Sequence, residues 1–483
     1  MFRRTKIVAT VGPASSSEDM LGRLIDAGVN VFRLNFSHGS ADTHRDTAAR
    51  IRRQAAARQK AVAILADLQG PKIRIARFAD GAVMLKTGQH FTLDTTLADQ
   101  AGDAHRVGLD YPELAHDSQP GDILLLNDGL IEMRVESVDA GRIQCVVTAG
   151  GRLSDNKGIN RQGGGLSARA LTEKDRDDII TAAEMDVDYL ALSFPRDATD
   201  VDEARSLFRD AGGEGGVVAK IERAEAVADN DTLDGIILAS DGVMVARGDL
   251  AVEIGDAELV GVQKHIIQRA RALDRFVITA TQMMESMINS PQPTRAEVSD
   301  VANAVLDGTD AVMLSAETAV GEYPEATVNA MARIILGAER TYQTYPGGAQ
   351  RLHEHFSRVD ESIAMAAMYV ANRLPGVRAI IAMTETGNTP QLMSRMRSGM
   401  PIFAFTPHPR TQRRVAIYRG VETIAFDSAS LPHDRVNQEA VATLQRQGLV
   451  QDGDTIIITK GDYVSAHGGT NALKIVTVGE VIR

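Results

Sequence analysis

The stretch Val217-Val218-Ala219-Lys220-Ile221-Glu222 joins a short apolar run to a basic–acidic pair, and Val243-Met244-Val245-Ala246 is likewise followed by Arg247-Gly248-Asp249. Side chains two apart in an extended segment point the same way, so Lys220 and Glu222 share one face. Carboxylates bind hard cations such as Mg²⁺, and an ammonium can stabilise the negative charge of a phosphoryl group. Each stretch therefore predicts a buried strand that ends in a charged site.

Similar apolar, β-branched-rich runs recur along the first two thirds of the chain, and most are separated by helical stretches. Alternation of strand and helix repeated eight times is typical of a (β/α)₈ TIM barrel. The expected strands are Ile7–Thr10, Val29–Arg33, Val62–Ala66, Tyr189–Ser193, Val217–Ala219, Val243–Ala246, Val277–Thr279 and Ala311–Leu314.

Polar residues follow seven of these eight runs. The chemistry of such a barrel lies at the C-terminal ends of its strands, where the side chains of different strands converge. The residues at these ends are Asn35, Ser37, Asp67, Ser193, Lys220, Glu222, Arg247, Asp249, Thr281, Ser315 and Glu317. Their shared position predicts a single active site at one mouth of the barrel.

The barrel pattern is interrupted once and then ends. Short alternating segments with Gly-rich turns fill residues 71–170, which predicts an inserted all-β domain, a small β-barrel, acting as a lid over the site. Residues 345–483 alternate strand and helix again and predict a C-terminal doubly wound α/β domain for effector binding or assembly. Residues 1–70 and 171–344 are left for the barrel.

Composition excludes several classes of protein. A net charge of -12 disfavours nucleic acid as a partner, because a phosphate backbone attracts basic surfaces. Cys145 is the only cysteine, so no internal disulfide can form. The basic N-terminus is followed by an apolar run, Ile7–Val11, that is too short for a signal peptide or a membrane span. We expect a cytoplasmic protein with no membrane partner.

Six segments of the chain resemble motifs of the pyruvate kinase family. They are Thr5–Ser15, Arg33–Gly39, Lys220–Glu222, Met244–Leu250, Thr281–Met287 and Leu314–Thr318, in the order and spacing of the family. The resemblance covers the barrel almost end to end and the other two domains more loosely. It implies transfer of a phosphoryl group from phosphoenolpyruvate to ADP, giving pyruvate and ATP, which is the last step of glycolysis.

The resemblance also implies the roles of individual residues. Glu222 and Asp249 would bind the catalytic Mg²⁺, for which Mn²⁺ could substitute. Lys220 and Arg33 would stabilise the migrating phosphoryl group, and Thr281 would help to protonate the enolate through water shared with Ser315 and Glu317. The residues expected to bind phosphoenolpyruvate are Arg33, Lys220, Ala246, Arg247, Gly248 and Thr281, and those expected to bind the nucleotide are Asn35, His38, Arg74, Asp128 and Lys157.

One departure from the family pattern concerns K⁺. Many pyruvate kinases need K⁺ and carry a glutamate where this chain has Lys72, in Asp67-Leu68-Gln69-Gly70-Pro71-Lys72. A tethered ammonium can replace a monovalent cation, so we expect a bacterial-type enzyme that does not require K⁺. The monovalent-cation site, or its substitute, would comprise Asn35, Ser37, Asp67, Leu68 and Lys72.

Two further features depend on loops. Gly163-Gly164-Gly165, where the lid returns to the barrel, predicts a looser hinge than usual. The loop that begins at Thr384 resembles the family's effector phosphate loop, with Lys460-Gly461 and His467–Asn471 facing it. Its expected ligands are Thr384, Thr386, Gly387, Asn388 and Thr389; a capped turn used only in assembly is the alternative.

Other functions remain open at this point. A TIM-barrel lyase could use Lys220 as a Schiff-base nucleophile, although Glu222 beside it favours metal chemistry. A non-catalytic sensor of phosphorylated metabolites could retain the fold and the C-terminal loop. A homotetramer follows from the family resemblance alone.

Overall fold

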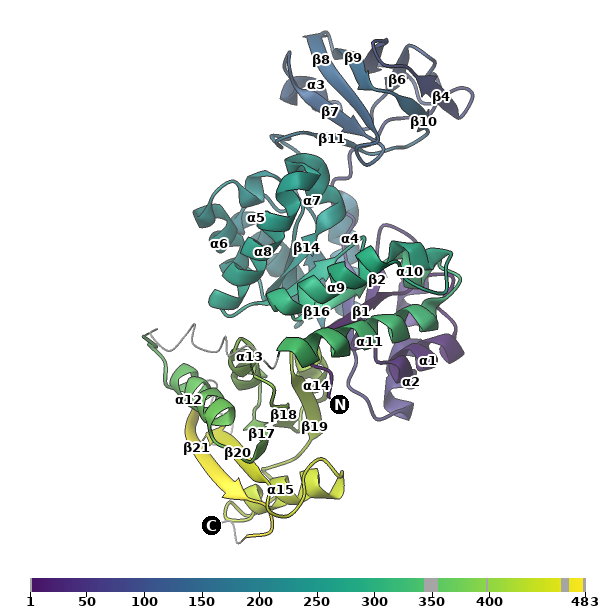
Figure 1. Ribbon diagram of the computed structural model, residues 1–483. Helices are drawn as coiled ribbons and strands as arrows, with labels where there is room; N and C mark the ends of the chain where they lie inside the picture. The colour runs from purple at the N-terminus through teal and green to yellow at the C-terminus, as the bar shows by residue number, and fades with distance from the viewer. Residues whose placement is uncertain (1, 343–354, 397, 462–468, 481–483) are drawn as a thin grey trace.

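A closed barrel of eight parallel strands forms the centre of the molecule (Figure 1). The computed structural model describes residues 2–342, 355–396, 398–461 and 469–480. The barrel order is β1-β16-β15-β14-β13-β12-β3-β2, so the predicted (β/α)₈ architecture is confirmed. Its strands are β1 (Lys6–Thr10), β2 (Val31–Asn35), β3 (Ala63–Asp67), β12 (Tyr189–Leu192), β13 (Gly216–Ile221), β14 (Gly242–Ala246), β15 (Phe276–Ala280) and β16 (Ala311–Leu314).

The barrel strands are buried on both faces, which explains why they read as continuous apolar runs. Helices pack around the outside, and their ends follow local capping rules: Ser17 caps α1, which closes at Gly28 with a φ of 110°, and Thr172 and Asp175 form a capping box at α4. The outer helices are α1 (Glu18–Ala27), α2 (Ala41–Ala57), α4 (Glu173–Glu184), α5 (Ala198–Asp210), α6 (Asn230–Ala239), α7 (Arg247–Ile254), α8 (Asp256–Ala272), α9 (Arg295–Asp307), α10 (Ala316–Ala319) and α11 (Pro324–Tyr342), with 3₁₀ turns η1 (Glu225–Val227) and η2 (Glu285–Ile288).

The inserted segment lies above the barrel mouth, at the top of Figure 1. Its six-stranded sheet has the order β11-β7-β8-β9-β5-β6, and β10 pairs with β4 in a second sheet. The closed small barrel that we expected is not complete: only isolated bridges from residues 74–78 span the gap between the edge strands. The elements are β4 (Ala82–Leu85), β5 (His90–Asp94), β6 (Arg106–Gly108), α3 (Leu114–Asp117), β7 (Ile123–Leu126), β8 (Ile131–Asp139), β9 (Arg142–Ala149), β10 (Gly151–Ser154) and β11 (Ile159–Arg161).

The C-terminal part is a five-stranded sheet with helices on both faces, as a doubly wound fold requires. Its order is β19-β18-β17-β20-β21, and only β21 runs antiparallel. Helices α12 and α13 cover one face and α15 the other. The elements are α12 (Val359–Arg373), β17 (Val377–Met383), α13 (Asn388–Ser394), β18 (Ile402–Thr406), α14 (Pro409–Val415), β19 (Val421–Ala425), α15 (Val436–Arg446), β20 (Thr455–Gly461) and β21 (Thr470–Thr477).

This C-terminal part docks on the end of the barrel opposite the lid (Figure 1). A buried ion pair joins Arg395 to Asp310, and the Tyr189 hydroxyl donates to the Arg414 carbonyl over 2.6 Å. The predicted boundary at residues 344–345 lies outside the described residues. Among the residues described, no helix is both long and apolar enough to cross a bilayer.

Candidate active site

Lys220 lies at the centre of a buried charged network at the C-terminal end of β13. Its Nζ lies 2.9 Å from Glu222 Oε1 and 3.3 Å from Asp67 Oδ1, and it donates to Ser193 Oγ over 2.8 Å. These partners follow or end strands β3, β12 and β13, which are consecutive in the barrel. The structure thus brings together, from three adjacent strands, side chains that are far apart in the sequence.

The network fixes the protonation state of Lys220. Burial alone would lower the pKa of its ammonium, but the Asp67 and Glu222 carboxylates outweigh burial and raise it. Burial likewise opposes ionisation of Asp67, yet Arg33 and Lys220 hold the pKa of that carboxyl below its usual value. Lys220 is therefore a fixed cation. A Schiff-base nucleophile must be a neutral amine, so this environment does not favour a lyase.

Arg33 joins the same network from the second strand. Its Nε donates to Asp67 Oδ2 over 2.5 Å, and its Nη1 donates to Thr10 Oγ1 over 3.1 Å. Asp67 thus bridges the two cations, Arg33 and Lys220. Two such cations at the mouth can attract the oxygens of a phosphoryl group in its transition state.

Glu222 and Asp249 supply two carboxylates that suit a divalent cation. Burial, and after it the charge of Asp249, raises the pKa of Glu222 although Lys220 opposes the shift. Glu222 Oε2 also accepts a hydrogen bond from the Phe194 amide over 2.9 Å, which orients it. Asp249 lies in the first turn of α7. A pair of mutually repelling carboxylates fits Mg²⁺, which keeps water and substrate oxygens in its remaining positions.

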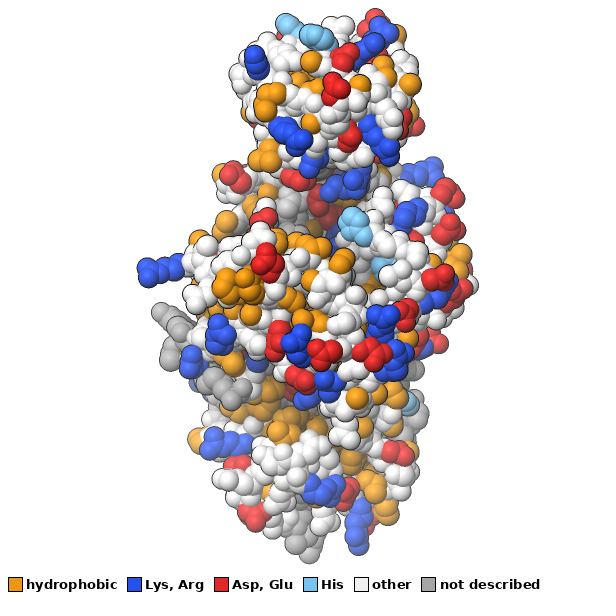
Figure 2. Space-filling view, turned by 90° about the vertical axis from the view of Figure 1, so that its right-hand side faces the viewer, with side chains coloured by type: hydrophobic (Ala, Val, Ile, Leu, Met, Phe, Trp, Pro, Cys, Tyr) orange, Lys and Arg blue, Asp and Glu red, His pale blue; other side chains and the backbone are white. Residues whose placement is uncertain are grey.

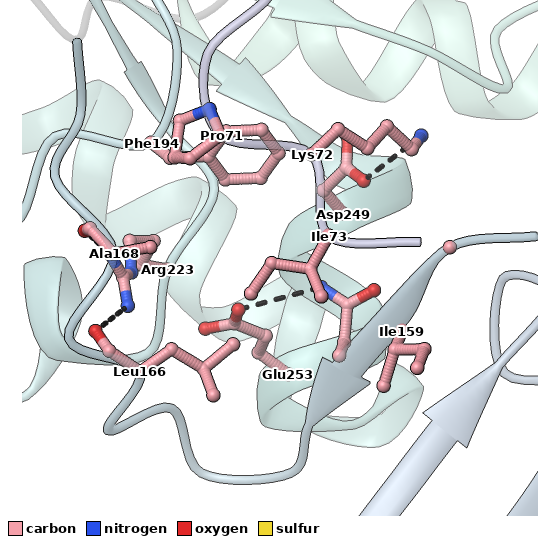
Figure 3. Close-up of a pocket in the computed structure, with 12 residues that line it drawn as sticks. Pro71, Lys72, Ile73, Ile159, Leu166, Ala168, Phe194, Arg223, Asp249 and Glu253 are labelled. Atoms are coloured by element: carbon pink, nitrogen blue, oxygen red, sulfur yellow. Dashed lines mark hydrogen bonds and ion pairs between the residues drawn. The ribbon is translucent and has the colours of Figure 1, made fainter. Parts of the chain in front are cut away.

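Within the described residues, no group of three or more acidic, histidine or cysteine side chains forms a closed metal cage. Glu222 and Asp249 are the two carboxylates that we expected to bind the metal from the sequence. Lys72 lies beside Asp249, with its Nζ 4.0 Å from Asp249 Oδ1; a dashed line in Figure 3 marks this ion pair. Asp67, by contrast, is engaged by Arg33 and Lys220. The Lys72 ammonium therefore lies beside an expected metal ligand instead of pairing with Asp67.

Thr281 sits in a strained turn directly after β15. Its φ is 64° and that of Gln282 is 54°, values that residues other than glycine seldom adopt. Thr281 Oγ1 accepts a hydrogen bond from the Gly248 amide over 2.9 Å. Strain of this kind persists only where surrounding contacts hold it, and it is typical of functional sites.

Arg247 supplies the contacts that hold this turn. Its guanidinium donates to the carbonyls of Thr281 and Gln282 and pairs with Asp300, with a closest N–O distance of 2.7 Å. The Arg247 side chain is buried in this clamp. Only the backbone of Arg247, beside Ala246, therefore remains available for the substrate-binding role that we expected.

Ser315 and Glu317 lie at the end of β16, and they differ in availability. Glu317 accepts hydrogen bonds from the amides of Ser315 and Met284, so its carboxylate already braces two loops. Burial raises the pKa of Glu317. Ser315 Oγ is buried and makes no hydrogen bond to any of the described residues. Ser315 Oγ is therefore free to bind a water molecule, whereas the Glu317 carboxylate is already bound to two backbone amides.

The residues expected to bind the nucleotide come from both sides of the hollow between lid and barrel, which is visible in Figure 2. Asn35 ends β2 and His38 follows it; Asn35 Oδ1 accepts a hydrogen bond from the Ser37 amide over 3.1 Å. Arg74, Asp128 and Lys157 belong to the lid. Among the described residues no hydrogen bond joins the two sets.

The expected effector loop lies between β17 and α13. The Gly387 amide donates to Thr384 Oγ1 over 2.9 Å, and Asn388 Nδ2 donates to Asp360 over 2.8 Å. Thr389 and Thr470 share a hydrogen bond of 2.7 Å between their hydroxyls. Residues 462–468 of the facing loop, including His467, lie outside the described residues. The Thr386 side chain makes no hydrogen bond in the described part of the chain.

Sequence reasoning missed two contacts in the barrel mouth. It placed Asp67 at a cation site and gave Ser193 no role, whereas both side chains bind Lys220. The position of Ser193 at a strand end was a usable signal. No signal in the sequence indicated that Asp67 bridges Arg33 and Lys220, because this contact depends on how three side chains of different length meet across the barrel.

Comparisons with known proteins agree with this geometry. Two family models match the chain: "Pyruvate kinase, barrel domain" over residues 2–328 and "Pyruvate kinase, alpha/beta domain" over residues 361–476. The chain is 57% identical to "Pyruvate kinase II" of Salmonella typhimurium, covering 99% of each protein. It is 54% identical to a pyruvate kinase of Haemophilus influenzae, covering 95% of this chain and 96% of that protein. A crystal structure of a pyruvate kinase from Cryptosporidium parvum superposes with a TM-score of 0.91 at 36% identity, covering 98% of this chain and 96% of that one.

Proposed function

The chain belongs to the pyruvate kinase family, and on that premise we propose how its own residues move a phosphoryl group from phosphoenolpyruvate to ADP. The activity itself, which yields pyruvate and ATP, follows from the full-length relatives at high identity. The observation that carries the assignment of residues is the protonated Lys220 ammonium, held between Asp67 and Glu222 at the barrel mouth.

Lys220 and Arg33 are proposed to stabilise the phosphoryl group during transfer. Both are fixed cations, both contact Asp67, and neither has to reorganise when negative charge develops on the migrating oxygens. The backbone of Ala246, Arg247 and Gly248, where β14 ends and α7 begins, is proposed to receive the substrate carboxylate. The Gly248 amide already donates to Thr281 Oγ1, which fixes this backbone in place.

Pyruvate kinases generally use Mg²⁺ and K⁺. We propose that Glu222 and Asp249 bind the divalent ion, which would neutralise the phosphate and carboxylate oxygens of the substrate. Mn²⁺ could occupy the same two carboxylates. The charge of Asp249 helps burial to raise the pKa of Glu222 although Lys220 opposes the shift, and a bound divalent cation would relieve the repulsion between the two carboxylates.

Lys72 is proposed to make K⁺ unnecessary. Its ammonium, 4.0 Å from Asp249, adds a permanent positive charge at the mouth of the site. The neighbouring groups of the expected monovalent site are Asn35, Ser37, Asp67 and Leu68. We propose that this tethered charge supplies locally what a bound K⁺ supplies elsewhere in the family.

Thr281 is proposed to deliver the proton that converts enolpyruvate into pyruvate. A hydroxyl is a weak acid on its own, so the proton would reach it through water next to Ser315, whose Oγ has no hydrogen-bond partner in the part of the chain that the structure describes. On the opposite side of the site, Asn35 and His38 of the barrel and Arg74, Asp128 and Lys157 of the lid would bind ADP.

The expectations for the C-terminal loop, the location and the assembly also stay proposals. The phosphorylated effector expected at Thr384–Thr389 would have to compete with Asp360 for Asn388, and α13 is only seven residues long. Cytoplasmic location, the homotetramer and the three domain boundaries likewise remain predictions. The rival sensor function is disfavoured by the full set of mouth residues and by the relatives.

An assay coupled to lactate dehydrogenase tests the proposal. The purified protein should form pyruvate from phosphoenolpyruvate and ADP when Mg²⁺ is present, without added K⁺. Absence of turnover with all components would refute the activity. Borohydride in the presence of a keto acid should leave Lys220 unmodified; a trapped adduct would favour the lyase instead.

A further inference from the structure

The segment that returns from the lid to the barrel, residues 163–168, is bound on both of its sides. We name it the return segment. On the lid side, Asp117 accepts hydrogen bonds from the Ser167 amide and hydroxyl at 2.9 and 3.1 Å, and Arg161 donates to the Gly164 carbonyl over 3.1 Å. The segment is thereby fixed to the body of the lid.

On the barrel side, Arg223 and Glu225 bind the return segment. Arg223, 3% exposed, donates to the carbonyls of Leu166 and Ala168 at 2.6 and 3.4 Å. Glu225 accepts a hydrogen bond from the Gly165 amide and lies 3.4 Å from Arg223. The second carboxylate oxygen of Glu225 is buried and makes no hydrogen bond among the residues that the structure describes. Figure 3 shows Arg223 pointing toward Leu166 across the pocket at this junction.

Glu253 binds the same region from α7. Its side chain accepts hydrogen bonds from the Ala224 amide at 2.8 Å and from Asn160 Nδ2 at 3.5 Å, and its carbonyl accepts from the Gly163 amide at 2.9 Å. Asn160 belongs to lid strand β11 and Ala224 to the barrel. One residue therefore connects the lid, the return segment and the barrel.

The three glycines fit this arrangement. Their φ values are 81°, 76° and 87°, a left-handed conformation that favours glycine. A Cβ on Gly164 would meet the Glu225 carboxylate, and one on Gly165 would meet the Arg161 guanidinium. We had expected a looser hinge from these residues. The contacts instead favour a hinge that is fitted closely to the barrel.

The barrel groups of this hinge occupy the same two elements as the metal carboxylates. Arg223 and Glu225 follow Glu222 directly after β13, and Glu253 lies one helical turn after Asp249 on α7. The lid is therefore attached to the part of the barrel that carries both expected metal ligands.

We propose that Arg223, Glu225 and Glu253 are positioning residues that seat the lid, by way of the return segment, in register with the metal carboxylates. The inference rests on the proposed role of the lid in nucleotide binding. It goes beyond that role by naming the barrel residues that set where Asp128 and Lys157 stand relative to Glu222 and Asp249.

The test compares Arg223→Met in the full-length protein with Arg176→Met, which breaks an exposed ion pair to Glu203 on the outer helices. If the seated lid becomes about tenfold less populated, the KM for ADP should rise about tenfold with kcat changed less than threefold. Mn²⁺ binding to the free protein should change less than twofold. Amide hydrogen exchange in the return segment should accelerate. Arg176→Met should match the wild type in all of these readouts.

Two variants guard against a general loss of folding. Glu225→Gln keeps the volume of the side chain and should raise the KM for ADP in the same direction, and Arg223→Lys should recover part of the loss. A folded Arg223→Met protein with wild-type exchange in the return segment and wild-type KM for ADP would overturn the proposal; so would an equal rise in the KM of both substrates. If the wild type does not form pyruvate, the proposed function fails, while the exchange experiment still tests whether Arg223 holds the return segment.

Discussion

The barrel mouth and the C-terminal loop at Thr384–Thr389 both follow parallel strands, yet they differ in how charge is arranged. At the mouth, Lys220 contacts Glu222 at the end of its own strand and Asp67 at the end of β3, and both carboxylates are buried. The C-terminal loop forms an internal turn, in which the Gly387 amide donates to Thr384, and the Asp360 carboxylate accepts a hydrogen bond from Asn388 of this loop. Buried cations that converge from several strands therefore indicate a phosphoryl-binding site more specifically than does a turn before a short helix.

The largest expected effect is at the centre of the mouth. Lys220→Met should lower kcat about 10³-fold, because it removes a fixed charge that acts on the migrating phosphoryl group. Coupled-assay kinetics, with circular dichroism to verify the fold, would measure this. If the variant retained a tenth of wild-type kcat, the charge of Lys220 would not be what drives phosphoryl transfer, and the contrast between the mouth and the C-terminal loop would fail.

The next effect separates the two halves of the reaction. Thr281→Ala should lower kcat about 10²-fold by removing the expected proton donor. Exchange of the pyruvate methyl protons with solvent, followed by NMR, should slow in the same proportion. Full turnover by this variant would remove the role of Thr281 and leave only its hydrogen bond to the Gly248 amide.

A third prediction concerns the fixed charge of Lys72. Wild-type activity should be the same in tetramethylammonium buffer and in KCl, whereas Lys72→Glu should lose about tenfold without K⁺ and recover when K⁺ is added. The reason is that the substitution removes the ammonium beside Asp249. A large activation of the wild type by K⁺ would refute the interpretation of this residue.

A smaller effect should appear in the pH dependence of the lid hinge. Burial raises the pKa of Glu253 to about 7, above its ordinary value of 4.5. The seated hinge therefore favours the protonated form: this stabilisation is complete below pH 4.5 and is lost as pH rises through 7. The charged groups around Glu253 are Arg223 and Glu225 from the barrel, Lys72 from the outgoing chain and Asp249 on its own helix.

The wild-type KM for ADP should accordingly rise about threefold between pH 6 and 8.5, while Glu253→Gln should stay flat over that range. Saturating phosphoenolpyruvate keeps the other substrate out of the comparison, and Arg176→Met should follow the wild-type slope. Identical pH profiles for the wild type and Glu253→Gln would show that protonation of Glu253 does not control the seating of the lid.

The fold was predictable from the sequence because eight buried strands read as apolar runs, and strand ends then located Lys220, Glu222 and Asp249. The side-chain directions were not predictable. Arg247 follows β14 like a substrate ligand, but its guanidinium turns back to clamp the loop at Thr281. The glycines at 163–165 indicated freedom, while the Glu225 carboxylate that binds the adjacent amide lies 60 residues further along the chain. Contacts of that separation depend on tertiary packing.

The smallest expected effect belongs to the C-terminal loop. Thr384→Val removes the hydroxyl that accepts the Gly387 amide, and because that loop lies at the opposite end of the barrel from the lid, kcat without effectors should change less than twofold. Fructose bisphosphate or AMP can then be titrated against the wild type and the variant. If a phosphorylated compound lowers the KM for phosphoenolpyruvate of the wild type but not of Thr384→Val, the loop is an effector site in spite of Asp360. If neither protein responds, the turn functions in structure or assembly, and the contrast with the barrel mouth becomes sharper.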